Sequence, residues 1–343
     1  MLKKLVFLAS LFLIFSHSLF AQNQVDLVQD AQKAGISFYW DPMTYTGLLE
    51  KNGHRISFRA GDDYCLQDYK KIIPEKAPVM QDGKLVANKT FMNTAENFFK
   101  VENVEVPYRI GAVLIDAGHG GKDPGASRVH KINGKNVNVV EKDINLKVAK
   151  MLCENLKSAY PDKKILMTRS TDVYLTLQQR TEIANSVKLK NNEAILFISI
   201  HVNTNFDQKV SGYEVWYLTP GYRRQVLDAK QYKEDAAVLP ILNSMMEEEY
   251  TTESILIAKF ITEGIAAQVG NLSPQRKIKP EEWFVCKNSK MPSVLCEIGF
   301  LSNPTEAALL ADDKYLQKIS LGIYNGLRSF VTHFERSRGF TGK

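Results

Sequence analysis

The chain has 343 residues, of which 44% are hydrophobic and 24% charged, and it carries a formal net charge of +6. This composition is that of an ordinary folded protein and excludes global disorder, while the length allows one large domain and a small one. The modest positive charge, without clustered Lys and Arg or a recognisable binding motif, argues against a nucleic-acid-binding protein.

The first 21 residues have the layout of a secretory signal peptide. Two lysines precede an apolar run from Leu5 to Phe15, and small residues follow up to Ala21. The run is short for a membrane span, which needs roughly 20 residues, and an uncleaved anchor is the alternative. We therefore expect cleavage near Gln22 and an exported protein of the periplasm or cell envelope, with no membrane span left after cleavage.

The four cysteines do not predict a thiolate metal cluster, because none lies in a Cys-x-x-Cys pair. Cys286 and Cys296 could form a disulfide in an oxidising compartment, or they could be two small buried residues. The sequence leaves both readings open.

Residues 22–105 are predicted to form a small α+β domain. A short helix is expected around Leu27 and Ala31, and hairpin signals occur at Lys51-Asn52-Gly53 and at Asp82-Gly83. The stretch loosely resembles small stalk domains of envelope proteins. Wall attachment or positioning and a plain folded spacer are both compatible with it.

Residues 106–335 alternate short apolar runs with helical periodicities, which predicts an α/β domain with an open, twisted, mostly parallel sheet flanked by helices. Apolar residues recur every four positions from Ile144 and again from Ile257, and a further helical region begins at Asn303. The predicted strands are Ala112–Ile115, Ile165–Thr168, Ala194–Ile200, Tyr213–Leu218 and Val294–Ile298.

Four side chains with metal-binding or acid–base chemistry lie at the ends of these elements. His119 and His201 directly follow strands, Glu141 opens a helix, and Glu297 closes a strand. Carboxyl ends of neighbouring strands share one sheet edge, where such folds bind ligands. Each residue also has a plain structural reading, although a carboxylate after an apolar strand is costly unless partnered. Spacing alone therefore makes a metal site plausible and no more.

Two other kinds of site are disfavoured. The Gly118-His119-Gly120-Gly121 turn lacks the Gly-Lys-Ser/Thr ending of a P-loop and the G-x-G-x-x-G of a dinucleotide fold. A serine hydrolase would need a G-x-S-x-G elbow, which is absent.

Several motifs in one order then make the resemblance specific. The chain contains IDAGHGGKDPGA, EKDINLKVAKML, TRSTDVYLTLQQRTEIAN, FISIHVN, GYEVWYL and MPSVLCEIGFLSNPTEAALL. From about Arg109 to Phe330 it resembles the zinc-dependent N-acetylmuramoyl-L-alanine amidases. The resemblance implies that His119, Glu141 and His201 bind Zn²⁺ and that Glu297 is the catalytic carboxylate.

The implied reaction is zinc-dependent hydrolysis of the amide between N-acetylmuramic acid and L-alanine in peptidoglycan, which releases stem peptides during wall remodelling or daughter-cell separation. One alternative is a zinc peptidase that cuts within the stem peptide. The other is a non-catalytic peptidoglycan-binding or activator protein with the same fold.

Three further expectations concern residues outside the four. Arg169, Asp172 and Arg180 are expected to form an ion-pair network that holds a helix, and Asn203 to satisfy a loop backbone or to bind substrate. Residues 221–253 include an acidic stretch that could cover the zinc site and be displaced by an activator protein, or that could be a solvated helix at its rim.

Overall fold

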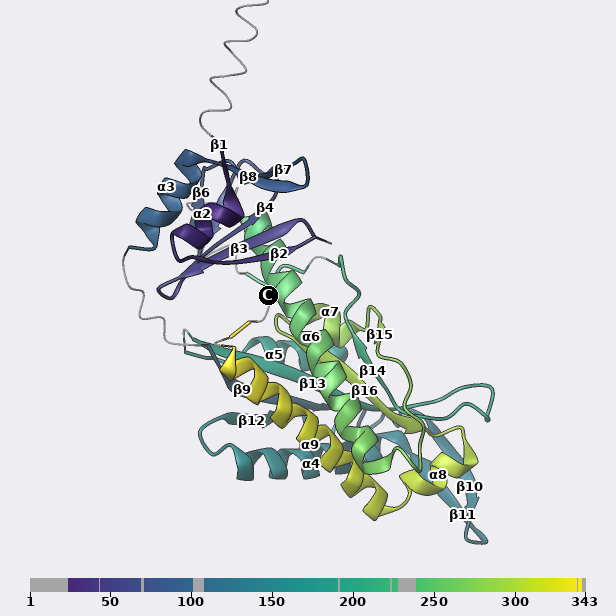
Figure 1. Cartoon of the computed structure of the whole chain (residues 1–343). Coiled ribbons are helices and arrows are strands. Elements are labelled where there is room, and N and C mark those ends of the chain that lie inside the picture. The colour runs from purple at the N-terminus through teal and green to yellow at the C-terminus, as the bar shows by residue number, and fades with distance from the viewer. Residues whose placement is uncertain are drawn as a thin grey trace, which may run out of the picture. The chain divides into compact units, whose positions relative to one another are not determined.

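The computed structural model describes residues 24–42, 44–68, 71–100, 108–190, 192–222, 224–227, 239–337 and 339–340. The chain divides into two compact units, Met1–Val106 and Pro107–Gly342 (Figure 1). The expected signal peptide lies outside the described residues. Within the described ranges, no helix combines the length and the apolar character needed to cross a membrane.

The first unit is a small α+β structure with two antiparallel sheets. The larger sheet has the order β2 (Ser37–Asp41), β3 (Thr46–Lys51), β4 (His54–Arg59), β5 (Cys65–Gln67) and β6 (Lys71–Ile73), and the smaller has β1 (Gln24–Asp26), β8 (Lys84–Asn88) and β7 (Val79–Gln81). Helices α2 (Leu27–Lys33) and α3 (Lys89–Phe98) complete it.

Two tight turns of this unit lie where the sequence predicted hairpins. Asn52 and Gly53 join β3 to β4, and Asp82 and Gly83 join β7 to β8, all four with positive φ. Two successive left-handed residues make the turn that matches the twist of the flanking strands.

The second unit contains a six-stranded sheet in the order β12-β9-β13-β16-β14-β15. All neighbouring pairs are parallel except β14 with β16. The predicted mostly parallel α/β fold is therefore confirmed. The strands are β9 (Arg109–Ala117), β12 (Lys164–Met167), β13 (Glu193–Asn203), β14 (Glu214–Tyr217), β15 (Lys279–Pro280) and β16 (Ser293–Phe300).

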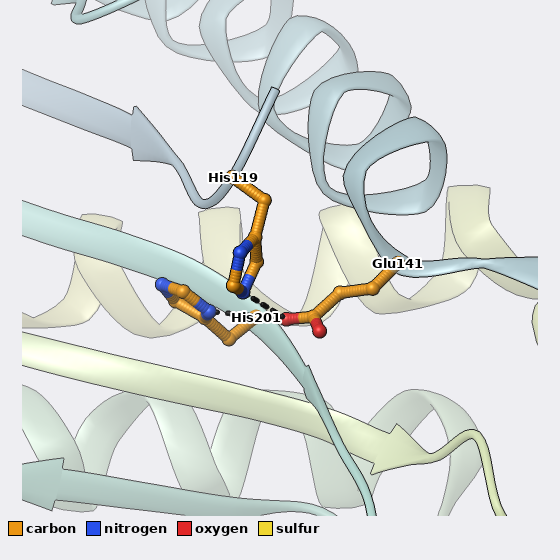
Figure 2. Close-up of side chains that lie close together, drawn as sticks. All are labelled: His119, Glu141 and His201. Atoms are coloured by element: carbon orange, nitrogen blue, oxygen red, sulfur yellow. Dashed lines mark hydrogen bonds and ion pairs between the residues drawn. The ribbon is translucent and has the colours of Figure 1, made fainter. Parts of the chain in front are cut away.

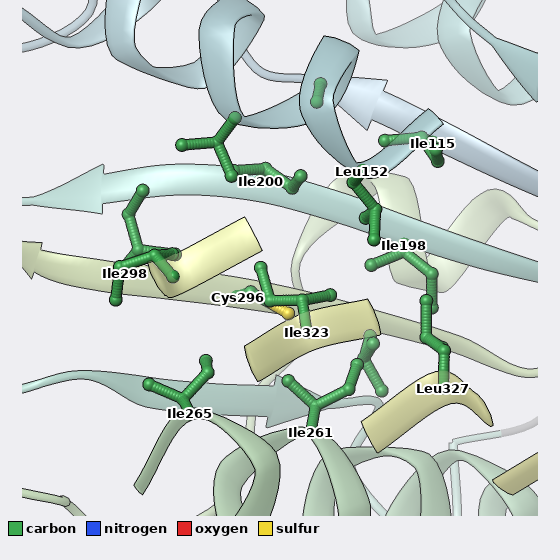
Figure 3. Close-up of a cluster of buried hydrophobic side chains, with 14 of the residues drawn as sticks. Ile115, Leu152, Ile198, Ile200, Ile261, Ile265, Cys296, Ile298, Ile323 and Leu327 are labelled. Carbon is green, nitrogen blue, oxygen red and sulfur yellow. The ribbon is translucent and has the colours of Figure 1, made fainter. Parts of the chain in front are cut away.

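Helices cover both faces of this sheet. The main core packs one face against α4 (Glu141–Ala159), α6 (Leu239–Val269), α8 (Pro304–Leu310) and α9 (Asp313–Arg336), and Figure 3 shows part of it. A smaller core on the other face includes residues of α5 (Leu177–Asn185) and α7 (Phe284–Asn288). Strand side chains alternate between the two faces, so each strand contributes to both cores.

Cys286 and Cys296 lie in different hydrophobic cores. Cys286 belongs to the smaller core and Cys296 to the main core, so the sheet lies between them, and both are free and buried. The sequence allowed either a disulfide or two buried free thiols, and the structure shows two buried free thiols.

One hairpin was not predicted. Strands β10 (Ser127–Ile132) and β11 (Lys135–Val140) form an antiparallel pair between the His119 turn and α4. Its turn residues, Asn133 and Gly134, both have positive φ and form an Asn-Gly hairpin signal that was present in the sequence.

Candidate metal centre

A cross-strand rung of polar side chains lies near the carboxyl ends of the parallel strands. His201 on β13 is the register partner of Glu297 on β16, and Glu297 is in turn the partner of Glu214 on β14. Neighbours such as Cys296 belong to the main core, so alternation places the rung on the opposite face of the sheet. The sheet thus aligns one imidazole and two carboxylates.

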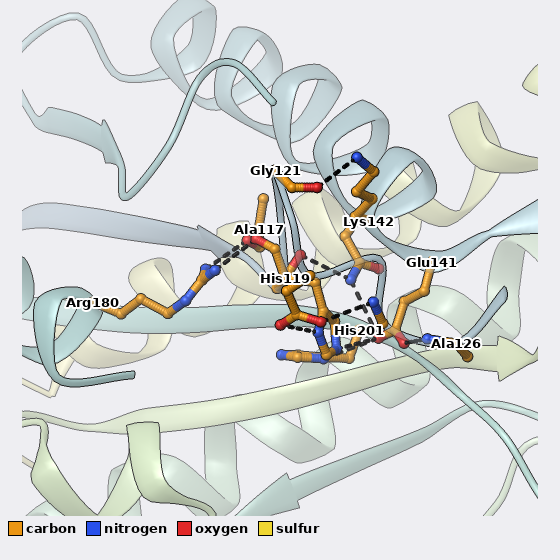
Figure 4. A network of polar contacts seen from close by, with 12 residues as sticks. Ala117, His119, Gly121, Ala126, Glu141, Lys142, Arg180 and His201 are labelled. Atoms are coloured by element: carbon orange, nitrogen blue, oxygen red, sulfur yellow. Dashed lines mark hydrogen bonds and ion pairs between the residues drawn. The ribbon is translucent and has the colours of Figure 1, made fainter. Parts of the chain in front are cut away.

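His119 reaches this edge from the turn that follows β9. Its φ is 58°, an uncommon left-handed conformation for a residue with a side chain, and such strain persists only where surrounding contacts hold it. Arg180 donates to the His119 carbonyl at 2.6 Å, and Arg169 donates to the carbonyls of Ala117 and Gly118 at 2.8 and 2.9 Å. Figure 4 shows Arg180 reaching the turn at Ala117 and His119.

Beneath the turn lies a buried ion pair. Asp116 accepts from Arg180 at 2.7 Å, from Thr168 at 2.6 Å and from Ser199 at 2.8 Å. Burial alone raises the pKa of Asp116, but Arg180 and the two hydroxyls outweigh burial and hold it below its ordinary value. Asp116 therefore stays ionised and anchors Arg180.

The arginine and aspartate residues of this network do more than the sequence suggested. Asp172 pairs with Lys142 of α4 at 2.7 Å, but it also accepts from the Gly121 amide at 2.7 Å. Among the described residues, Arg169 donates only to backbone carbonyls, including that of Lys142. The prediction that they hold a helix was thus incomplete, because they fix the His119 turn and dock it onto the start of α4.

Glu141 is the first residue of α4 and is buried. Backbone amides at the start of a helix lack intrahelical partners, and here those of Glu141 and Lys142 donate to the carbonyls of Ala126 and Pro124. The Glu141 carboxylate accepts from the amides of Ala126 at 2.7 Å and Val202 at 3.1 Å. These contacts fix the carboxylate between the His119 turn and the end of β13.

The three predicted zinc ligands converge (Figure 2). One ligand atom each of His119, Glu141 and His201 can be chosen so that all lie within 4.8 Å of one another. Glu141 Oε1 lies 3.2 Å from His119 Nε2 and 3.1 Å from His201 Nδ1. Burial favours neutral Glu141, but hydrogen bonds from both imidazoles hold its pKa well below the ordinary value. The site thus offers an anionic oxygen between two imidazole nitrogens.

Two glycines make room for this arrangement. A Cβ on Gly118 would lie 2.3 Å from His201 Cε1, and a Cβ on Gly125 would lie 2.5 Å from Glu141 Oε2. Gly125 also has a φ of +65°, which disfavours a side chain. Both positions therefore require glycine as long as the three ligands stay in place.

The donor set fits Zn²⁺. Two imidazoles and one carboxylate are a ligand set of catalytic zinc, which keeps a fourth position open. His119 Nδ1 lies 2.8 Å from Asp123 Oδ2, which leaves Nε2 facing the shared centre. Burial lowers the pKa of His119, but Glu141 and Asp123 together raise it above the ordinary value. Such a carboxylate behind a ligating histidine orients the ring and increases its basicity.

Glu297 lies next to the metal ligands but is not one of them. It is not in the group of ligand atoms within 4.8 Å, although its strand position is opposite His201. The residue is 8% exposed, and its Oε2 has no hydrogen-bond partner among the described residues. Burial, followed by the negative charges of Glu141 and Glu214, raises its pKa well above the ordinary value. A carboxyl group in this setting can accept and return a proton.

Sequence reasoning missed Asp116, Asp123 and Glu214. An acidic residue at the end of the apolar strand VLID was a visible signal for Asp116, as Glu297 was for β16. Asn203 was expected to serve the loop or the substrate. Its Oδ1 accepts from the Thr204 amide, but its Nδ2 donates to Glu214 at 2.9 Å, so it also links the loop to the rung.

Comparisons with known proteins agree with this geometry. Residues 113–329 match the family model described as N-acetylmuramoyl-L-alanine amidase. The chain is 33% identical over 226 residues to a putative N-acetylmuramoyl-L-alanine amidase of Buchnera aphidicola subsp. Baizongia pistaciae, covering 64% of this chain and 95% of that protein. It is 30% identical over 229 residues to the germination-specific N-acetylmuramoyl-L-alanine amidase of Bacillus subtilis, covering 64% and 79%.

A solved N-acetylmuramoyl-L-alanine amidase of Clostridium difficile 630 is 28% identical to the chain, with a TM-score of 0.48. The match covers 65% of this chain and 98% of that one.

Proposed function

The chain belongs to the N-acetylmuramoyl-L-alanine amidase family, and on that premise we propose that Glu297 is the general base of its reaction. Members of this family are zinc hydrolases that cut the amide between N-acetylmuramic acid and L-alanine in peptidoglycan. The residues that hold the zinc are His119, Glu141 and His201.

Zinc bound by such ligands acts as a Lewis acid that polarises the scissile carbonyl and lowers the pKa of water. Glu297 takes the proton from the attacking water and then delivers a proton to the nitrogen of L-alanine as the carbon–nitrogen bond breaks. The products are a free stem peptide and a glycan strand without that peptide. Asp123 and Arg180 keep His119 in place during these steps.

The observation that carries the proposal is the position of Glu297. It is buried on the rung next to His201, with one carboxyl oxygen unpartnered among the described residues. An unpaired buried carboxyl group costs stability, so a protein that only bound peptidoglycan would have no use for it beside a complete ligand set. This favours an enzyme over the non-catalytic alternative.

Digestion of purified peptidoglycan by residues 22–343 tests the reaction. We expect soluble peptides with L-alanine at the N-terminus, detected by mass spectrometry, and their loss when a chelator is added. Fragments cut within the stem peptide would instead identify a peptidase, and no release with zinc bound would identify a binding protein.

Because the family acts on the cell wall, we also propose a cellular location for the protein. We place the mature chain outside the cytoplasm after removal of residues 1–21, where it would release stem peptides in wall remodelling or daughter-cell separation. Residues 22–105 would position the enzyme on the wall or serve as a folded spacer. N-terminal sequencing of the protein recovered from the cell envelope tests the first point, and intact Met1 in the cytoplasmic fraction would contradict it.

We propose further that residues 221–253 restrain the enzyme until an activator protein displaces them; residues 223 and 228–238 of this stretch lie outside the described residues. On their flanks, Arg224 pairs with buried Glu247 and donates to the carbonyls of Ser289 and Met291, just before β16. Glu297 lies four positions after Ser293 along β16, which is about 13 Å of strand. The contacts of Arg224 are thus near the amino end of β16, whereas the zinc residues lie near the carboxyl ends of the parallel strands.

Deleting residues 228–238 tests whether this part of the stretch inhibits the enzyme. A rise in the basal rate of the folded variant would support the inhibitory role, and an unchanged rate would eliminate it.

A further inference from the structure

The second carboxylate of the rung, Glu214, pairs with two cationic side chains. It is 2% exposed, and Arg276 Nε and Lys279 Nζ both donate to its Oε2 at 2.8 Å. Asn203 donates to the other oxygen at 2.9 Å. One cation neutralises a buried carboxylate, so the second leaves a formal surplus of one positive charge at this point.

Among the described residues, Glu214 is the one ion-pair partner of both Arg276 and Lys279. Glu297, the neighbouring acidic residue of the rung, pairs with neither. Lys279 has three donor hydrogens and uses one of them for Glu214. Besides its bond to Glu214, Arg276 donates from Nη1 to the Ser211 carbonyl, and its Nη2 donates to none of the described residues. Their side chains are 33% and 35% exposed, so donors are left for a ligand.

Both cationic groups are held in fixed positions. The Lys279 ammonium lies 4.7 Å from the centroid of the Trp216 ring, and the Arg276 guanidinium lies 5.2 Å from that of Phe300. Contacts of this kind stabilise a cation over a ring face. Because both groups bond the same oxygen, they lie close enough together to engage one anion.

The cluster lies one strand beyond Glu297, on the side away from His201. Glu214 and Glu297 are antiparallel register partners, so their Cα atoms are about 4.5–5.5 Å apart. An extended peptide advances about 3.3–3.6 Å per residue. From a scissile amide midway between His201 and Glu297, the cluster is about one and a half strand spacings away, roughly 7 Å, so an extended peptide would bring its second residue, the one after L-alanine, to the cluster.

We propose that Arg276 and Lys279 form a subsite for a carboxylate of the stem peptide, the free α-carboxylate of the residue that follows L-alanine. Glu214 is the positioning residue that holds the two cations. A guanidinium matches a carboxylate in shape and charge, and the ammonium adds a second charge-assisted bond. The inference rests on the proposed amidase function, because it takes that substrate as the ligand.

A pair of muramyl tripeptides tests the subsite. They differ only in whether the second residue carries a free α-carboxylate or the corresponding carboxamide. Binding is measured by calorimetry on zinc-loaded Glu297→Gln protein, so that the result does not depend on turnover. We expect roughly tenfold tighter binding of the carboxylate form, since a hydrogen bond to a charged group supplies about that factor.

Further substitutions in the Glu297→Gln protein show which residues cause the preference for the carboxylate peptide. Lys279→Met and Arg276→Met should each reduce it several-fold, and Lys279→Arg should retain most of it. Lys277→Met is the matched control, because Lys277 is exposed and lies between the two residues in sequence. Should Arg276→Met fail to fold, Lys279→Met carries the test alone, since Lys279 lies on the sheet edge.

The outcomes separate the two proposals. Equal affinities of the Glu297→Gln protein for the two peptides, or a preference that is undiminished in Lys279→Met, would overturn the subsite whether or not the wild-type protein cuts peptidoglycan. Failure of the wild-type protein to release stem peptides would overturn the amidase function, while the binding preference would still report on the subsite.

Discussion

His201 and Glu297 are register partners on neighbouring parallel strands, so one set of backbone hydrogen bonds fixes a zinc ligand and the proposed base. The register then shifts between His201 and Asn203, and the amide of Val202 at this shift donates to Glu141. The sheet thus sets both the spacing of metal and base and the position of the third ligand.

Replacing a ligand should remove the metal. In His201→Ala and in His119→Ala, two protein ligands remain, and a zinc site needs at least three. We expect the zinc content, measured by plasma mass spectrometry, to fall from about one per chain to near zero. His333→Ala is the control, because His333 is exposed on α9 and should leave zinc unchanged. Full zinc in His201→Ala would show that the ligand assignment is wrong.

Asp123 should affect zinc affinity without being a ligand. Asp123→Asn removes the negative charge behind His119 but keeps an oxygen that can accept from Nδ1. Loss of such a partner typically costs 10–100-fold in metal affinity, and we expect a decrease of about that size in chelator competition. Asp313→Asn, at an exposed surface pair with Lys147, should not change the affinity. Unchanged zinc affinity in Asp123→Asn would refute the role.

Asp116 should contribute stability that depends on pH. Asp116→Asn leaves Arg180 as an unpaired buried charge, which typically costs about 3–5 kcal/mol in the free energy of unfolding. Denaturant unfolding at neutral pH measures this cost, and exposed Asp143→Asn serves as the control.

The pH dependence follows from the direction of the Asp116 shift. The pKa of Asp116 is lower in the folded chain than the ordinary value of about 3.9, so its contribution is complete above that pH. The contribution is lost as the pH falls through the folded-state pKa. The stability gap between the wild-type protein and Asp116→Asn should therefore narrow in acid, and a gap that stayed constant with pH would contradict the account.

Local sequence signals predicted the main strands and helices because they depend on neighbouring residues. The α4 helix follows from Glu141 and the period-four apolar residues, and β13 and β16 from their apolar runs. Convergence at the site depends instead on strand order. Nothing local states that β13 lies between β9 and β16, which is what brings His119 and His201 together.

The resemblance to the amidase family indicated that four residues, His119, Glu141, His201 and Glu297, belong to one site, which local signals could not. It gave no indication of Glu214, whose place beside Glu297 follows from the antiparallel register of β14 with β16. Nor could it show that Arg169 and Arg180 serve the His119 turn, because their partners are backbone carbonyls, which every residue has. Contacts to the backbone leave little trace in a sequence.

The most direct test of the mechanism measures zinc content and amidase rate on one preparation of Glu297→Gln. The amide keeps the shape of the side chain but cannot accept the proton, and an uncharged group is easier to bury than a carboxylate. We expect zinc content and thermal stability close to those of the wild type, with the rate lower by about 10²–10⁴-fold. Exposed Glu263→Gln on α6 is the matched control and should behave as wild type. Zinc loss in Glu297→Gln would make Glu297 a ligand, and a rate within about threefold of wild type would contradict its role as the base.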